Sequence, residues 1–183
     1  MGDVFYSEKG KGISKDKVIE NGKYECVLYG ELYTKYKEVI FDIASKTDEN
    51  GGLKSQVGDL LIPSSTTTTG IDLANVTAIN KENVLLGGDI TVLRTKEEIN
   101  NVFYAYYLSN QKKDEIASYA QGSTIVHLYY NHIKGMIIDM PSLNEQNKIA
   151  ISFSIIDEKI ETEIMLLQKL LNQKKYLLAN LFI

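Results

Sequence analysis

The residues best suited to chemistry in this chain are lysines and tyrosines gathered near its beginning. The lysines of this segment are Lys9, Lys11, Lys15, Lys17 and Lys23, followed by Lys35 and Lys37. Tyrosines are interleaved with them, at Tyr6, Tyr24, Tyr29, Tyr33 and Tyr36. Lysine can neutralise phosphates, and tyrosine can stack on bases or form hydrogen bonds, so the mixture suits a nucleic-acid surface. The alternative is an ordinary solvated surface whose tyrosines are half buried in strands.

Signatures of catalysis are missing from the sequence. Neither Pro63 nor Pro141 stands in the Asn-Pro-Pro-aromatic pattern used for methyl transfer to a base, and Gly10-Lys11-Gly12 lacks the spacing of a phosphate-binding loop. Asp157-Glu158-Lys159 contains the end of a metal-nuclease pattern without its upstream acid. His127 has no nucleophile or carboxylate at a known spacing, and two histidines with one cysteine do not make a zinc site. We therefore predict a non-catalytic chain without a metal or cofactor.

Composition and charge bound the remaining possibilities. At 183 residues, 44% of them apolar, the chain is long enough for one globular domain plus an appendage. Its net charge of −4 argues mildly against a nucleic-acid binder, although the lysines are concentrated near the start. Nothing near Met1 resembles a signal peptide, no run reaches roughly 18 apolar residues, and the single Cys26 excludes an internal disulfide. We expect a soluble, cytoplasmic protein that does not contact membranes.

The elements that must position the lysines and tyrosines begin with short strands and turns. Strands are expected at residues 23–29, 39–43, 60–62, 84–86 and 90–93. The turn Gly87-Gly88-Asp89 between the last two predicts that they form a hairpin. Ser64–Gly70 is rich in hydroxyl side chains and predicts a loop, which either contacts a ligand or is merely mobile.

Helices follow these strands. Lys96–Ser109 has apolar residues at helical spacing, with two glutamates near its start where the helix dipole favours them. A shorter helix is expected over Gln111–Ala120 because a glycine follows it. Met136–Met140 predicts a final strand. Strands first, helices inserted and one more strand indicate an α+β fold with a mixed sheet rather than repeating βαβ units.

The last part of the chain predicts one long amphipathic helix. Ser142 and Glu145 have the spacing of a capping box, and Asn144 is a competing cap. Some 36 helical residues would extend about 54 Å, which is longer than a domain of this size is wide. We therefore expect the helix to project and to form a coiled coil. The alternative is a terminal helix that packs along its own domain.

One side of this helix carries an apolar stripe that would form the coiled-coil contact. Its residues are Phe153, Ile156, Ile160, Ile164, Leu167, Leu170, Leu171, Leu177, Leu178 and Leu181. Glu163 and Lys174 interrupt the stripe, and charged residues in such places can set register or partner orientation.

An ordered series of short motifs runs through the chain. The series is Gly12-Ile13-Ser14-Lys15, Tyr29-Gly30-Glu31-Leu32-Tyr33, Gly58–Ile62, Gly88–Arg94, Phe103–Leu108, Gly122–Leu128 and Pro141–Ala150. Its most specific pair is Gly-Ser-Thr at 122–124 followed by Pro-x-Leu-x-Glu-Gln at 141–146. Over nearly its whole length, the chain resembles one half of the DNA-specificity subunit of type I restriction–modification systems. That half is a target-recognition domain followed by its spacer helix.

The resemblance implies that residues 1–140 read one half of a bipartite double-stranded DNA target and that residues 141–183 form the spacer helix. It also implies methyltransferase subunits that pack on the spacer helices and supply the chemistry, joined for restriction by translocase–nuclease subunits. The candidates for phosphate contact are Lys9, Lys11, Ser14, Lys15 and Lys17. The candidates for contact with bases or backbone are Tyr29, Tyr33, Ser64, Ser65, Thr66, Thr67, Ser123, Thr124 and His127.

The chain departs from the family pattern in one respect. A complete specificity subunit carries two recognition domains and two spacer helices, whereas one of each is found here. We therefore predict that two copies associate antiparallel through the stripe, which implies a target with inverted-repeat halves. One alternative is a truncated half whose partner domain is not identical. Others are a recognition domain that serves a combined methyltransferase–nuclease, and a helix-mediated interaction protein that does not bind DNA.

Overall fold

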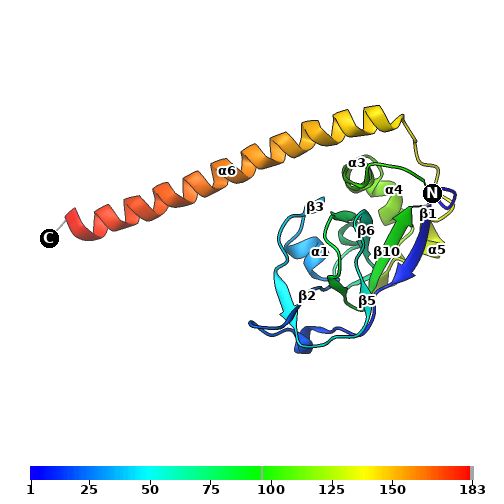
Figure 1. The fold of residues 1–183 in the computed structure, drawn as a ribbon, viewed down its shortest axis with the longest axis horizontal. Coiled ribbons are helices and arrows are strands. Elements are labelled where there is room, and N and C mark those ends of the chain that lie inside the picture. Colours follow the sequence, from blue (N-terminus) through cyan, green and yellow to red (C-terminus); the bar gives the residue numbers. More distant parts are fainter. Residues whose placement is uncertain (96, 182–183) are drawn as a thin grey trace.

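One long helix, α6 (Leu143–Leu181), projects from a domain of mixed β-sheets (Figure 1). The computed structural model describes residues 1–95 and 97–181, so the last two residues of the predicted helix lie outside the described residues. The α+β class predicted from the order of elements is confirmed. At 1.5 Å per residue, the 39 residues of α6 extend about 58 Å.

Three sheets build the domain. The first has five strands in the order β1 (Phe5–Lys9), β10 (Ile90–Thr95), β6 (Asp59–Pro63), β8 (Thr77–Ile79) and β3 (Val39–Ile40). The second has four, in the order β4 (Ser45–Thr47), β2 (Tyr24–Val27), β9 (Leu85–Leu86) and β5 (Leu53–Lys54). The third pairs β7 (Ser65–Thr66) with β11 (Val126–His127). Neighbouring strands are antiparallel except for the parallel pairs β3–β8 and β2–β9.

Short helices fill the connections between strands. They are α1 (Glu31–Thr34), α2 (Gly70–Leu73), α3 (Asn101–Tyr106), α4 (Lys113–Ser118) and α5 (Tyr130–Ile133), with a 3₁₀ turn at Lys15–Lys17. A π-helical segment, Tyr107–Gln111, continues α3. The predicted helix over Gln111–Ala120 therefore corresponds to α4.

Strand β6 shows where the core lies, because all five of its residues are buried. Leu60 and Ile62 point to one side, where they join a cluster that includes Tyr104 of α3. Leu61 points to the other side and packs with Leu86 of the second sheet. Side chains alternate between the two faces of a strand, so a continuous apolar run fits a strand covered on both sides.

Arg94 of β10 is buried and links the two larger sheets through hydrogen bonds. Its guanidinium donates to both carboxylate oxygens of Asp59, at 2.9 and 3.2 Å, and to the carbonyl of Lys54 in β5 at 3.0 Å. Glu8 of β1 makes a further ion pair with the same guanidinium. The hydrogen bonds to Asp59 raise the pKa of Arg94, so this side chain stays charged although it is buried.

The hairpin predicted for residues 84–93 is wrong. The turn at Gly87–Asp89 exists, but β9 pairs with β2 and β5 whereas β10 pairs with β1 and β6. The turn thus carries the chain from one sheet to another. Asp89 has φ +57°, a left-handed conformation that aspartate tolerates better than most residues.

Two other element predictions also need correction. The helix predicted from Lys96, a residue outside the described ones, begins instead at Asn101, because the Asn100 side chain accepts a hydrogen bond from the Phe103 amide at 2.9 Å. The two glutamates therefore precede the helix and do not lie in its first turn. Met136–Met140 forms no strand. This segment is instead held by single contacts, such as the chain's terminal amine to the Met136 carbonyl at 2.6 Å.

Helix α6 begins as its sequence predicted. The Glu145 carboxylate accepts from the Ser142 amide at 3.0 Å, and the Ser142 hydroxyl accepts from the Glu145 amide at 3.4 Å. This capping box satisfies the first free amides of the helix and identifies Ser142, rather than Asn144, as the cap.

The first prediction concerns the Arg94–Asp59 pair. Because Asp59→Ala leaves the buried guanidinium with its main partner missing, we expect a loss of about 3–5 kcal/mol in the free energy of unfolding. Asp114→Ala, which removes an exposed carboxylate from α4, should change it by less than about 0.5 kcal/mol. Urea unfolding followed by circular dichroism measures both. Equal stabilities of the two variants would contradict the prediction.

Candidate nucleic-acid interface

The segment that follows β1 lies against the turn between β9 and β10. The amide of Gly10 donates to the carbonyl of Ile90, and that of Lys11 to the carbonyl of Leu86, both at 2.9 Å. A side chain at Gly10 would place its Cβ 2.0 Å from the Gly87 carbonyl oxygen, so only glycine permits this approach. The predicted phosphate-binding lysines on either side of Gly10 are thereby fixed beside the turn.

These lysines differ in how far they are already neutralised. Two of them form ion pairs, Lys9 with Asp89 at 3.6 Å and Lys17 with Glu49 at 3.0 Å. Lys11 and Lys15 are exposed, and neither has an ion pair within the described residues. They are therefore the cations of this segment that are most available to a phosphate.

A cleft of about 870 Å³ separates this segment from α1. Ser14 and Lys15 line one side, Tyr29 lines another, and Asp89 stands at the turn. Tyr33 lies next to Tyr29, with a ring-centroid distance of 6.5 Å, but does not itself line the cleft. A partly exposed aromatic ring beside a lysine can contact both a base and its phosphate.

Helix α1 places one carboxylate, Glu31, in the wall of this cleft. Its oxygens accept hydrogen bonds from Ser45 at 2.6 Å, Lys35 at 2.7 Å and the Leu28 amide at 2.9 Å. The carboxylate is buried and fully engaged, so it stabilises the wall rather than binding a ligand.

A second group of aromatic side chains lies beside Lys9. His127 stacks on Tyr129 at a centroid distance of 5.6 Å, and the tyrosine hydroxyl lies 3.1 Å from His127 Nδ1. The ammonium of Lys9 is 5.6 Å from the centre of the Tyr129 ring, close enough for a cation–π contact. The exposed residues Ser123 and Thr124 occupy the preceding turn.

The hydroxyl-rich segment is not the loop that the sequence predicted. Ser64, Ser65 and Thr66 are buried, and the last two form β7. Their hydroxyls bond inside the domain, to Thr91 at 2.7 Å, Asp89 at 2.9 Å and Thr68 at 2.7 Å respectively. Of the four candidate readers in this segment, only Thr67 is exposed. The other three stabilise the turn at Gly87–Asp89 and strand β11, which contains His127.

Asp89 joins the two groups of candidate residues, because it lines the cleft, pairs with Lys9 and accepts from Ser65. Neither Asp89 nor Tyr129 was predicted from the sequence. We call the combined surface the reader face, and its residues are Lys9, Lys11, Ser14, Lys15, Tyr29, Asp89, His127 and Tyr129. It offers hydrogen bonds, charges and stacking. Within the described part of the chain, no three metal-binding side chains gather.

Helix α6 is attached to the domain by one side of its first turns. Phe153 packs against Tyr106 of α3 at a centroid distance of 5.0 Å, and the Tyr106 hydroxyl donates to Asp157. Ala150 is buried between helix and domain, and the last contact is an ion pair of Glu161 with Lys37 at 3.3 Å. Burial and the Asp157 carboxylate raise the pKa of Tyr106, so its hydroxyl stays protonated as the donor.

Comparison with known proteins places this arrangement in a family. Residues 1–172 match the type I restriction modification DNA specificity domain. The chain belongs to this family. Among the residues that the structure describes, none of the specificity domain's helices is long and apolar enough to cross a membrane.

Solved structures with the same fold are about twice as long or more. The S subunit of a type I restriction–modification system from M. genitalium superposes with a TM-score of 0.66 at 22% identity, over 94% of this chain and 41% of that one. The HsdS subunit from Thermoanaerobacter tengcongensis gives 0.59 at 15% identity, over 88% and 37%. A chain described in work on the assembly and conformational transition of the type I system gives 0.64 at 15%, over 96% and 42%. The specificity domain thus spans about two fifths of these chains.

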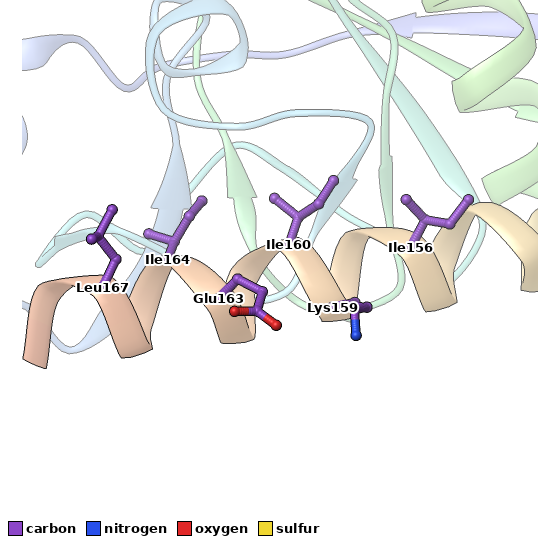
Figure 2. A pocket seen from close by; sticks show the side chains of 6 residues that line it. All are labelled: Ile156, Lys159, Ile160, Glu163, Ile164 and Leu167. Atoms are coloured by element: carbon purple, nitrogen blue, oxygen red, sulfur yellow. The ribbon is translucent and has the colours of Figure 1, made fainter. Parts of the chain in front are cut away.

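Beyond Glu161, the helix of the specificity domain leaves the domain and its apolar stripe is exposed (Figure 1). Figure 2 shows Ile156, Ile160, Ile164 and Leu167 along one side, with Lys159 and Glu163 on the adjoining flank. These six residues line a shallow hollow of about 400 Å³. Because most of an apolar row at helical spacing is left in solvent, this surface has the character of an unfilled interface.

The second prediction concerns the attachment of the helix. Phe153→Ala removes the ring that packs on Tyr106, and we expect a loss of about 1 kcal/mol in the free energy of unfolding. Phe41→Ala is the matched control, since Phe41 is 71% exposed and should cost little. Urea unfolding of Phe153→Ala, Tyr106→Ala and the double variant measures their coupling. Strictly additive losses would show that the rings do not interact.

Proposed function

We propose that this specificity domain reads one half of a bipartite DNA target and that two copies pair through α6 to read both halves. In this role the chain catalyses nothing and carries no cofactor. Methyltransferase subunits dock on the paired helices and modify the DNA, and translocase–nuclease subunits join them for restriction. The observation that supports the proposal is that one chain bears both the reader face and a long apolar stripe that its own domain leaves exposed.

The reader face supports DNA binding although the whole chain is acidic. Lys11 and Lys15 are exposed and have no ion pair within the described residues. Tyr29, which is 37% exposed, lines the same cleft as Lys15. Lysines near phosphates supply most of the salt-dependent affinity, whereas base contacts supply specificity. With few free cations, the lone chain should bind DNA weakly. Tight binding by the lone chain at high salt would contradict the proposal.

Two other functions are distinguished by experiment. A helix-mediated interaction protein would keep the dimer and show no dependence on the reader-face lysines. A recognition domain that serves a combined methyltransferase–nuclease would use the same face with a different partner. Single-molecule methylation sequencing of cells that carry the chain and its methyltransferase reports the target, its symmetry and the modified base together. An inverted-repeat target would support two identical readers.

The third prediction tests the reader face by charge reversal. Lys11→Glu with Lys15→Glu should weaken DNA binding at least about tenfold and should make the plot of log affinity against log salt shallower by about 2, since each lysine lost is one phosphate contact fewer. Filter binding or fluorescence anisotropy across a salt series measures both. Lys169→Glu is the control, because that lysine is exposed on the distal half of α6. Unchanged methylation by the reconstituted complex would show that this surface is not the DNA face.

The fourth prediction tests the dimer. Wild-type chain should sediment at twice its 20.6 kDa at micromolar concentration. Leu167→Asp should shift it to monomer, because a charge replaces an apolar side chain in the stripe. Met165→Asp is the control, since Met165 is equally exposed, 58% against 57%, and lies on the other side of the helix. A wild-type chain that is strictly monomeric with and without DNA would refute the dimer.

A further inference from the structure

The distal part of α6 carries a regular heptad seam. Its positions alternate in steps of four and three, as the seam of a coiled coil does. They are Ile156, Ile160, Glu163, Leu167, Leu170, Lys174, Leu177 and Leu181. The six apolar members are 41–69% exposed, so the domain of the same chain does not cover them. A seam of this length spans about 38 Å of helix.

The seam is symmetric about its own centre, between Gln168 and Lys169. Counted outward from this point, seam positions occur at the same distances toward both ends of the helix. An antiparallel copy centred there therefore matches every seam position with another one. The apolar layers are Ile156 with Leu181, Ile160 with Leu177, and Leu167 with Leu170, each formed twice.

The same symmetry pairs the two charged members. We infer that two copies of α6 pack antiparallel in the register that sets Glu163 of each copy against Lys174 of the other. This inference deepens the proposed function and rests on its dimer. The occupant of the stripe is then a second copy of this chain, because in this register apolar positions meet apolar positions and Glu163 meets Lys174.

Alternative pairings leave the charges uncompensated. A parallel pair in register sets Glu163 against Glu163 and Lys174 against Lys174, and like charges in a seam repel. A shift of the antiparallel pair by one heptad sets Glu163 against a leucine. A charge buried in an apolar seam without a partner costs several kcal/mol, so both alternatives are disfavoured. Polar seam residues fix register and orientation in this way at some cost in stability.

Figure 2 shows the part of one helix where this contact would form, with Ile164 in the same row as Ile156, Ile160 and Leu167. The hollow lined by Ile156, Ile160 and Leu167 is open to solvent, and Glu163 stands at its flank. In the inferred pair, Leu177 of the second copy packs at Ile160, while the second copy's Lys174 reaches Glu163. The hollow on each helix is thereby filled by the distal half of the other.

The fifth prediction is a charge-swap experiment on the full chain. Glu163→Lys places a lysine against Lys174 in both layers and should weaken dimer affinity about a hundredfold. Lys174→Glu places a glutamate against Glu163 and should weaken dimer affinity by a similar factor. The double variant should recover wild-type affinity. A mixture of the two single variants should form heterodimers in preference to homodimers. Lys175→Glu is the matched control, because this neighbouring lysine lies off the seam. Sedimentation equilibrium measures all five samples.

Disulfide cross-linking tests the register independently. Ile160→Cys and Leu177→Cys copies should cross-link when mixed, whereas Ile160→Cys alone should not, because its two cysteines would lie about 26 Å apart along the axis. The native Cys26 does not interfere, since it is buried and burial raises the pKa of its thiol to about 11.

The outcomes separate the register from the dimer on which it rests. A wild-type monomer overturns both. A wild-type dimer in which Ile160→Cys cross-links with itself is parallel and overturns the register alone. A dimer that is insensitive to the charge swap, with no cross-link in the mixture, also overturns the register. A stripe covered by a methyltransferase subunit instead would leave the free chain monomeric.

Discussion

The position of α6 relative to the reader face depends on the packing of its first turns against the domain, with the Phe153–Tyr106 ring pair among the contacts. The contacts of Ala150, Phe153, Asp157 and Glu161 fall on successive turns and on one side of the helix. A helix held over several turns by a buried residue, a ring pair and two polar contacts cannot swivel without breaking all of them. This attachment sets the direction of the rest of α6. A contact far along the helix therefore lies at a fixed position relative to the domain.

The distribution of charge explains how an acidic chain can present a basic surface. Several carboxylates are used inside the domain, where Asp59 pairs with Arg94 and Glu31 accepts three hydrogen bonds. Lys11 and Lys15 remain outside such pairs among the described residues. Net charge therefore says little about this surface. The net charge of −4 argues only mildly against nucleic-acid binding, and this argument is weakened further because some of the carboxylates are engaged inside the domain.

Local patterns predicted the elements that local physics controls. The buried run of β6 and the capping box at Ser142 were both predicted correctly, because burial on two faces and helix caps leave signals in adjacent residues. The hairpin prediction was wrong because a turn such as Gly87–Asp89 has the same sequence whether its two strands pair with each other or enter two different sheets. The prediction of a loop over the hydroxyl-rich segment was wrong for a related reason. The hydrogen-bond partners of Ser64 and Ser65 lie more than 20 residues away in the sequence. The one sequence signal for Asp89 as a site residue is its position after two glycines. Nothing nearby in the sequence indicates its contact with Lys9.

The inferred register has a geometric consequence for the target. In that register the two-fold axis passes between Gln168 and Lys169, and it relates the two reader faces as well as the two helices. A dyad of the DNA must then coincide with the same axis, as symmetric readers require. The two Asp157 contacts lie about 35 Å apart along the helices, close to one turn of B-form DNA. Because each domain is attached at that point, the length of α6 between Asp157 and the axis would set the separation of the two domains and with it the spacing of the half-sites.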